Sequence, residues 1–281
     1  MDLVDIKDRL WNGSINIKIL ININGKDSQY LSRVYRNSYF PIIFEDIILY
    51  YSLDLPILQK VPIWLEYEQV PIKWNLPVGV LYDYLYKPGI QPESTNTWFL
   101  NLRYKGDNFE NNDYPWEYIV PFQVKVNNCI DYSRSLNQIV MSQLKQAVFI
   151  LNGNSKPVMN LSKSDSNDLF ESIRIHNLYD YNRINKKILG QITQYQKLPI
   201  KFYIPGTNQI QSPLALQEIS LTLQDLLLKQ FPNLFPDVHN SFAIPYIQGI
   251  DSTSLMLVDL TQIWQTFKLV DNFLHIVLIL K

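Results

Sequence analysis

Isoleucine occupies every second position of the segment 15–23, and mostly polar residues stand between the isoleucines. Successive side chains of a β-strand point to opposite faces, so this segment predicts a strand with one buried face. Asn24-Gly25 follows directly, and both residue types accept the positive φ angles of a two-residue turn. Together with a return strand near 30–35, the segment predicts a β-hairpin.

A helix precedes this hairpin, and two helix–strand pairs follow it. Apolar residues at helical spacing predict a short helix over 3–10. Pro41 begins an apolar helix that reaches about Tyr51, because proline is tolerated at the first helical position. A helix starting at Pro77 is then expected between strands at 63–67 and 98–104. The order after the first helix is hairpin, helix, strand, helix, strand.

The last third of the chain repeats this order. The predicted elements are strands near 200–204 and 210–216, a helix framed by Thr222 and Asp225, a strand at 242–246, a helix capped by Asp259, and a closing strand at 273–280. The closing run is apolar at almost every position, which is typical of a central strand covered on both faces.

The segment between the two repeats has a helical period instead. A stripe of apolar residues predicts a helix over 132–151, and a polar loop is expected over 153–168. A second helix is predicted to carry Leu169, Ile173, Ile184 and Ile188 on one face and to end at Gly190. This segment is interpreted as a helix-rich module.

Hairpin, helix, strand, helix and central final strand is the order of a ubiquitin-like β-grasp domain. The sequence therefore predicts an α+β protein in which two such domains flank a helix-rich one. We expect the N-terminal helix and the first ubiquitin-like domain over 1–121, the helix-rich domain over 122–190, and the second ubiquitin-like domain over 191–281.

Charge and cysteine content exclude several classes of protein. The chain has 25 basic and 26 acidic side chains, so it lacks the basic excess of a nucleic-acid binder. Its single cysteine, Cys129, permits no internal disulfide and fits a reducing compartment. The N-terminal segment lacks a signal-peptide core, and no apolar run approaches the ~20 residues of a spanning helix. We therefore expect a soluble intracellular protein that binds no nucleic acid.

The residues that could carry catalysis are few and scattered. His176, His239 and His275 are far apart in sequence, so neither a metal site nor a cofactor is expected. Cys129 could be the nucleophile of a ubiquitin-type transferase, but no adjacent residue stabilises its thiolate, and a structural thiol is favoured. The final segment 276–281 lacks the glycine through which ubiquitin-like modifiers are transferred. An adaptor, scaffold or acceptor is therefore expected rather than a donor.

Three segments carry a specific pattern: RLWNG at 9–13, PIKWNLPVGVLYD at 71–83 and LKQAVFILNG at 144–153. In order and spacing they resemble the autophagy protein 5 family in its fungal form, over nearly the whole chain. The resemblance implies two ubiquitin-like domains around a helix-rich domain, which agrees with the pattern of elements. It also implies a role other than catalysis.

Members of this family accept the ubiquitin-like autophagy protein 12 through an isopeptide bond to one lysine. They also bind the N-terminal helix of autophagy protein 16, whose coiled coil dimerises the complex. The conjugate acts like an E3 ligase: it promotes transfer of autophagy protein 8 from its E2 enzyme to phosphatidylethanolamine. The resemblance thus implies a cytoplasmic scaffold in peripheral contact with the pre-autophagosomal structure or isolation membrane. It acts there in autophagosome formation and cytoplasm-to-vacuole transport.

By the same resemblance, Lys145 is the isopeptide acceptor. Helical geometry agrees, since Lys145 lies roughly 95° from the centre of the apolar face at ~100° per residue. Trp11, Trp74 and Tyr82 could line the groove for the partner helix, but sequence alone favours the core for each. Two alternatives remain open: a β-grasp interaction module without a conjugate, and a transferase that uses Cys129.

Overall fold

The first sheet of the computed structural model is built on strand β1 (Ser14–Ile23), whose alternate isoleucines from Ile15 to Ile21 are at most 5% exposed. β1 pairs with antiparallel β2 (Lys26–Tyr35), and Gly25 in the turn has a φ of +81°. The predicted hairpin is therefore confirmed. The structure describes residues 3–23, 25–87, 97–106, 125–126, 129–190, 197–206, 210–211, 214–215, 221–237 and 240–281.

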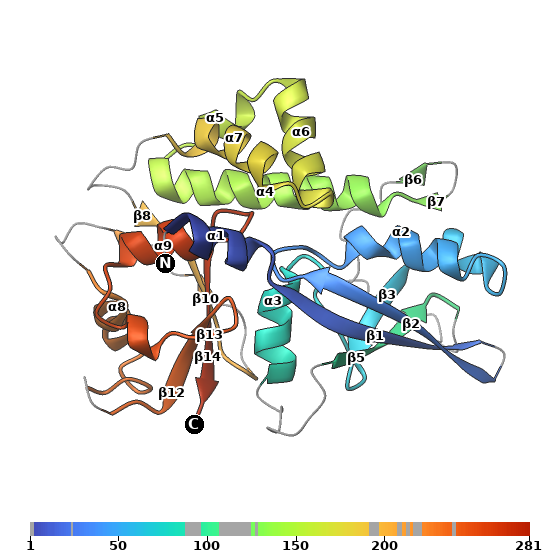
Figure 1. Cartoon of the computed structure of the whole chain (residues 1–281), viewed down its shortest axis with the longest axis horizontal. Helices are drawn as coiled ribbons and strands as arrows, with labels where there is room; N and C mark the ends of the chain where they lie inside the picture. Colours follow the sequence, from blue (N-terminus) through green and yellow to red (C-terminus); the bar gives the residue numbers. More distant parts are fainter. Residues whose placement is uncertain are drawn as a thin grey trace. The chain divides into compact units, whose positions relative to one another are not determined.

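Five strands form this sheet in the order β2-β1-β5-β3-β4 (Figure 1). β5 (Thr97–Tyr104) lies in the middle, parallel to β1 and antiparallel to β3 (Ile63–Tyr67), and β4 (Val70–Pro71) closes the far edge. Helix α2 (Pro41–Tyr50) buries Pro41, Ile43, Phe44 and Ile47, and the ring of Phe40 just before it packs 5.7 Å from that of Trp98 in β5. The mixed sheet with this strand order is the predicted β-grasp.

Short elements complete this part of the chain. They are α1 (Leu3–Trp11), the 3₁₀ turn η1 (Pro56–Gln59), α3 (Val78–Leu81), a π-helical turn (Tyr82–Tyr86), β6 (Lys125–Val126) and β7 (Cys129–Ile130). The helix predicted from Pro77 is thus a single α-helical turn that widens into a π-turn.

The second sheet repeats the arrangement. Its strands, in the order β10-β9-β14-β12-β13, are Ile210–Gln211, Ile200–Tyr203, Leu274–Leu280, Ala243–Ile247 and Ile250–Asp251. Residues 274–278 of β14 are all buried, and β14 pairs in parallel with β9 and antiparallel with β12. The prediction of a central strand covered on both faces is confirmed. A separate two-stranded sheet joins β8 (Lys197–Leu198) to β11 (Leu214–Ala215).

The helices of this second domain begin where their caps predict. In α8 (Leu223–Gln230), Thr222 and Asp225 form a capping box, in which each side chain accepts from the other residue's backbone N–H. Asp259 accepts from the N–H of Gln262 at 3.0 Å and starts α9 (Leu260–Phe267), which the 3₁₀ turn η4 (Thr253–Leu255) precedes. Their apolar faces pack on the sheet in one buried cluster.

The helix-rich part differs from the prediction. It contains α4 (Tyr132–Asn152), α5 (Lys156–Met159), α6 (Lys163–Arg174) and α7 (Leu178–Leu189). The polar loop expected over 153–168 is wrong, because Ser162 caps the start of α6 by accepting from the N–H of Asp165. The single helix expected over 169–188 is also wrong.

The helical conformation is interrupted between α6 and α7, at His176 and Asn177. His176 has a φ of +60°, which no α-helix accommodates, and Asn177 caps the new helix by accepting from the N–H of Asp180. The four apolar residues predicted to share one face are nonetheless all buried. Their spacing therefore identified the core but not the break.

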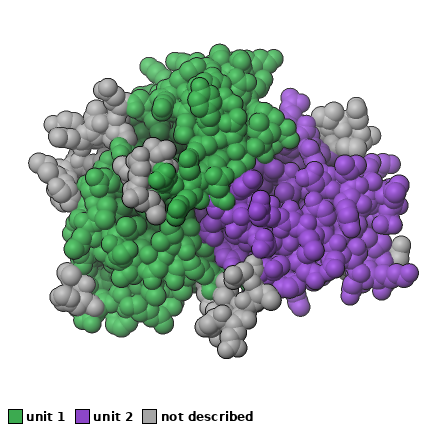
Figure 2. All heavy atoms as spheres, in the orientation of Figure 1, with its two compact units in different colours: residues 1–12, 83–88, 140–281 green, residues 13–82, 89–139 purple. Residues whose placement is uncertain are grey.

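The chain divides into two compact units (Figure 2). Unit 1 comprises residues 1–12, 83–88 and 140–281, and unit 2 comprises residues 13–82 and 89–139. The boundary falls inside α4, between Ile139 and Val140. Across the described ranges, no helix combines the length and apolarity needed to cross a membrane.

Candidate functional site

Lys145 lies on the solvent side of α4. Its neighbours Leu144 and Val148 are fully buried, so the helix is held by its apolar face, while Lys145, to one side of that face, is exposed. Ser142 and Phe149, one turn away on either side, are also exposed, and the Phe149 side chain is 58% exposed. An exposed amine beside an exposed aromatic ring is therefore presented on a rigid, well-packed helix.

Trp11 is held at the end of α1 by contacts within unit 1. Its indole Nε1 donates to the carbonyl oxygen of His176 at 3.1 Å, and its ring stacks on that of His176 at 4.7 Å. A third ring, that of Tyr181, lies 5.3 Å away. Burial is the main cause that lowers the pKa of His176 to about 4, so its ring is neutral near pH 7. Trp11 is 8% exposed, the position of a core residue.

Trp74 and Tyr82 belong to unit 2, unlike Trp11. Trp74 is 4% exposed. Tyr82 is half-buried: its ring meets that of Trp98 edge-on at 5.7 Å, and the Arg36 guanidinium lies 5.7 Å from its centre. Trp11 and Trp74 thus have the burial of the core residues that sequence alone favoured, and Tyr82 is the one of the three that stays half-buried.

The backbone beneath Tyr82 is fixed by a close approach at Gly79. The Gly79 N–H donates to the Arg36 carbonyl at 2.7 Å, and an Arg36 guanidinium N–H donates back to the Gly79 carbonyl at 3.3 Å. A Cβ at position 79 would lie 2.8 Å from both the Cβ and the carbonyl oxygen of Arg36. Only glycine therefore fits here, which explains one residue of the PVGVLYD segment.

The other residues singled out as possible catalysts lie only partly within the described part of the chain. The side chain of Cys129 and the whole of His239 lie outside the described residues. His275 is buried in β14. Within the described part of the chain, no group of three or more His, Cys, Asp and Glu side chains is placed to hold a metal ion.

A buried cluster of charged and polar groups was not predicted from the sequence. It consists of Lys201 and Tyr203 of β9, Asp271, and His275 of β14, and we call it the Asp271 cluster. All four side chains lie within unit 1 and are at most 3% exposed. The Asp271 carboxylate accepts from His275 Nε2 at 3.0 Å and from the Phe273 N–H at 3.1 Å, and the Lys201 ammonium lies 3.9 Å away.

The hydrogen bonds define the charge of each group in the Asp271 cluster. Burial lowers the pKa of His275 and raises that of Tyr203, so both are neutral near pH 7. His275 then donates from Nε2 to Asp271 and accepts the Tyr203 hydroxyl at Nδ1, 2.9 Å away. Burial alone would raise the pKa of Asp271, but the hydrogen bond from His275, the charge of Lys201 and the Phe273 N–H outweigh it and hold that pKa low.

The Asp271 cluster contains the groups of a catalytic relay, but its burial indicates a structural role. An acid–imidazole–hydroxyl chain can activate a nucleophile only where a substrate reaches it, and these groups are sealed from solvent. The charges of Asp271 and Lys201 compensate each other, and the Lys201 ammonium also lies 3.8 Å from the centre of the Phe273 ring. The sequence signals were Lys201 and His275, each inside an otherwise apolar strand.

Comparison with known proteins identifies similarity along most of the chain. Three family models match in order: Autophagy protein ATG5, UblA domain, over residues 10–122; the alpha-helical bundle region of the same protein over 133–191; and its UblB domain over 197–278. The chain is 44% identical to autophagy protein 5 of Debaryomyces hansenii over 286 residues, covering 99% of this chain and 96% of that protein.

Two further proteins extend the similarity. The chain is 46% identical to autophagy protein 5 of Candida albicans over 285 residues, covering 99% of this chain and 98% of that protein. The crystal structure of Kluyveromyces marxianus Atg5 has a similar fold, with a TM-score of 0.74 at 21% identity, over 98% of this chain and 99% of that one. Sequence and fold thus lead to the same group of proteins.

Proposed function

The chain belongs to the autophagy protein 5 family and has a role in autophagy, and we propose that it is the acceptor that carries autophagy protein 12 on Lys145. In this proposal the protein is a non-catalytic scaffold. The ubiquitin-like modifier is joined to it covalently, and the N-terminal helix of autophagy protein 16 binds it without a covalent bond.

The position of Lys145 is the observation that carries the proposal. An acceptor amine must reach the active site of a transferring enzyme, and Lys145 is exposed on a helix whose other face is fully buried. Phe149 offers an exposed apolar contact one turn away, of the kind that a docked enzyme or modifier buries. The segment LKQAVFILNG that contains both residues is also one of the three that carry the family resemblance.

The bond would form by aminolysis of a thioester. The neutral Nζ of Lys145 attacks the carbonyl carbon that links the C-terminal glycine of autophagy protein 12 to the cysteine of its E2 enzyme. The C–N bond forms, the C–S bond breaks, the cysteine leaves as thiolate, and the amine loses its proton. The acceptor side chain needs only to be a primary amine that can shed a proton, a condition that arginine does not meet.

The assembled conjugate would act at a membrane without being embedded in it. We propose that it works like an E3 ligase, promoting transfer of autophagy protein 8 to phosphatidylethanolamine in autophagosome formation and cytoplasm-to-vacuole transport. The net charge of −1 offers no general attraction to anionic lipid. Contact with the pre-autophagosomal membrane should therefore be peripheral and depend on the complex.

Lys145→Arg tests the proposal directly. The variant should fold and bind the autophagy protein 16 helix like the parent, because exposed substitutions usually change stability by less than ~0.5 kcal/mol. It should form no isopeptide with autophagy protein 12, and lipidation of autophagy protein 8 should fall sharply. The matched control is Lys156→Arg, an equally exposed lysine on α5, which should conjugate normally.

Mass spectrometry of the protein isolated from its own cells gives the decisive readout. A branched peptide at Lys145, absent from the Lys145→Arg variant, supports the proposal. A conjugate that still forms on that variant would show that another lysine is the acceptor. Loss of lipidation in a Cys129→Ser variant, with the Lys145 conjugate intact, would favour the transferase alternative instead.

A further inference from the structure

Lys145 is the one charged side chain along most of α4. Between Ser135 and Asn152 the helix sequence carries no other ionisable group. The exposed positions beside the lysine, Ser142 and Gln146, are polar but uncharged. An enzyme that selects this lysine therefore finds no charge to guide it along this part of the helix, and recognition here must depend on shape and apolar contact.

Phe149 is the apolar side chain within reach of that amine. It follows Lys145 by four residues, and residues at this spacing lie on the same side of a helix with Cβ atoms about 5–6 Å apart. Helical side chains lean toward the N-terminal end of the helix, so the Phe149 ring covers the turn that carries Lys145. The ring is 58% exposed although Val148 beside it is fully buried. The helix thus presents an amine and an aromatic ring together.

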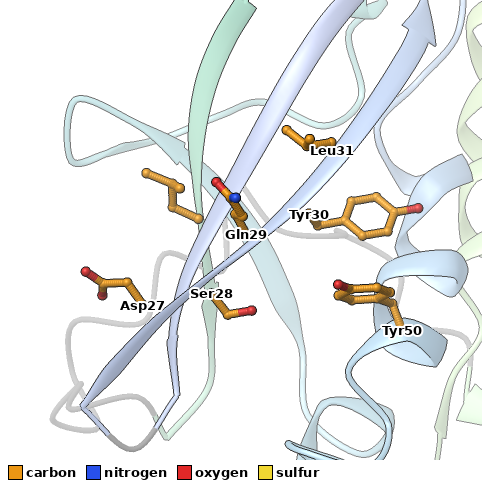
Figure 3. Close-up of a pocket in the computed structure, with 7 residues that line it drawn as sticks. Asp27, Ser28, Gln29, Tyr30, Leu31 and Tyr50 are labelled. Carbon is orange, nitrogen blue, oxygen red and sulfur yellow. The ribbon is translucent and has the colours of Figure 1, made fainter.

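Phe149 differs in one respect from the similarly exposed ring of Tyr50 in α2. Tyr50 is 59% exposed, but its ring lies 5.3 Å from that of Tyr30 and 4.8 Å from that of Tyr51. Figure 3 shows the Tyr30 and Tyr50 rings next to each other beside the pocket along β2. Within the described ranges, Phe149 has no such ring contact. Contacts inside unit 2 thus account for Tyr50, whereas the exposure of Phe149 has no counterpart explanation.

The geometry of transfer determines what covers Phe149. Attack on a thioester brings the two reacting atoms to about 3–3.5 Å. The thioester carbon is bonded to the cysteine of the E2 enzyme, so the enzyme surface around that cysteine must approach the helix within one turn of Lys145. The modifier reaches the same point only through its C-terminal glycine. The surface that meets the Phe149 ring is therefore that of the enzyme rather than the body of the modifier.

We propose that Phe149 is the docking residue by which the E2 enzyme of autophagy protein 12 selects Lys145, and that an apolar pocket next to the active-site cysteine receives its ring. This role rests on the proposed function, in which Lys145 is the acceptor. An aromatic ring that fills a pocket at the centre of an interface supplies much of the binding energy. Phe149 moves no proton and forms no bond, so it affects binding of the charged enzyme and not the rate of aminolysis after binding.

Single-turnover conjugation tests the docking role. The E2 enzyme, charged with autophagy protein 12, is mixed with increasing concentrations of the unconjugated full chain, and the half-saturating concentration and the maximal rate are measured. Phe149→Ala should raise the half-saturating concentration at least about tenfold and change the maximal rate by less than about twofold. Phe149→Leu keeps a large apolar side chain and should stay within about threefold of the parent in both quantities.

Tyr50→Ala is the matched control, because it removes a similarly exposed ring from another helix and should leave both quantities unchanged. Thermal melting of each variant confirms that it folds. Direct binding of the uncharged enzyme, with its active-site cysteine replaced by serine, separates the enzyme from the modifier. Its dissociation constant for Phe149→Ala should rise by the same factor as the half-saturating concentration.

The results distinguish the docking role from the proposed function. A parent that forms no conjugate at Lys145 refutes both. If the parent conjugates at Lys145 and Phe149→Ala keeps its half-saturating concentration, or loses only maximal rate, the docking role alone is overturned. An equal effect of Tyr50→Ala overturns it as well. If the uncharged enzyme binds the parent no more tightly than it binds Phe149→Ala, the ring does not contact the enzyme and the proposal is wrong.

Discussion

Asn185 of α7 and Asn272 of the turn before β14 donate a side-chain hydrogen bond to each other, at 3.0 and 2.8 Å, in the interior of unit 1. Both are buried, and Asn272 has a φ of +62°, a conformation that asparagine tolerates better than most residues. Its carbonyl also accepts from the indole of Trp264 at 3.0 Å. The amide pair thus couples the last helix of the bundle to the second β-grasp sheet.

Asn185→Leu should destabilise the protein by removing the Asn185–Asn272 hydrogen bonds. The substitution introduces an apolar side chain of similar size and leaves the buried Asn272 amide without its partner, which costs about 1–3 kcal/mol. The urea midpoint of unfolding should fall accordingly. Lys186→Ala, an exposed change on the same helix, should shift it by less than ~0.5 kcal/mol. Equal midpoints for the two variants would contradict a role for the pair.

The Asp271 cluster should make the chain sensitive to acid in two steps. The folded-state pKa of His275 lies below the ordinary 6.5, so lowering the pH through that value protonates only the unfolded chain and reduces the free energy of unfolding. The folded-state pKa of Asp271 lies below the ordinary 3.8, so its contribution is present above that value and is lost as the pH falls further.

Asp271→Asn separates the second step from the first. At neutral pH the variant should lose about 3 kcal/mol, because the Lys201 charge is left buried without its counter-ion. Below about pH 4 its stability should depend less on pH than that of the parent. Urea titrations at several pH values measure both effects. A parallel pH dependence in parent and variant would show that Asp271 does not supply the acid step.

His176 provides a further titration within unit 1. Burial lowers its pKa to about 4, so between pH 6.5 and 4 the unfolded chain binds a proton at this residue and the folded chain does not. The free energy of unfolding should therefore fall by about 2 kcal/mol across this range. His176→Asn keeps a residue that tolerates positive φ but does not titrate. The free energy of unfolding should vary less with pH across this window than in the parent; an unchanged slope would refute the assignment.

Gly79→Ala should be strongly destabilising although it adds one methyl group. The new Cβ would meet the Arg36 backbone oxygen at 2.8 Å, so the chain must move, at a cost of about 2 kcal/mol or more. Gly153→Asn is the control, since that glycine has open space around it and a φ of +72° that asparagine accepts. Thermal unfolding of both variants distinguishes close packing at Gly79 from a general need for glycine.

Local signals in the sequence sufficed for most of the fold. The alternating isoleucines, the capping residues Thr222 and Asp259, and the apolar run of β14 each act within a few residues. The break at His176 is marked by neither glycine nor proline, and its one local signal, the cap residue Asn177, was not recognised. Helix α6 was missed because its first turns are polar and only its second half is buried.

The candidate site, like the fold, could be predicted from the sequence only in part. The exposure of Lys145 follows from helical periodicity, but its chemical role came from family resemblance and stays a prediction. Trp11 and His176, which stack on each other, are 165 positions apart in the sequence. Lys201 of β9 likewise contacts Asp271, which lies in the distant turn before β14. Contacts of this kind depend on tertiary packing, which no spacing rule in a single sequence encodes.

The central position of β14 has a consequence for how the protein is made. Until Leu280 has left the ribosome, β9 and β12 have no strand between them, and each exposes a full row of unpaired backbone groups. The second β-grasp domain can therefore close only after its synthesis is complete. A premature stop codon even ten residues upstream would leave not a shortened domain but an open sheet, a substrate for chaperones and proteases.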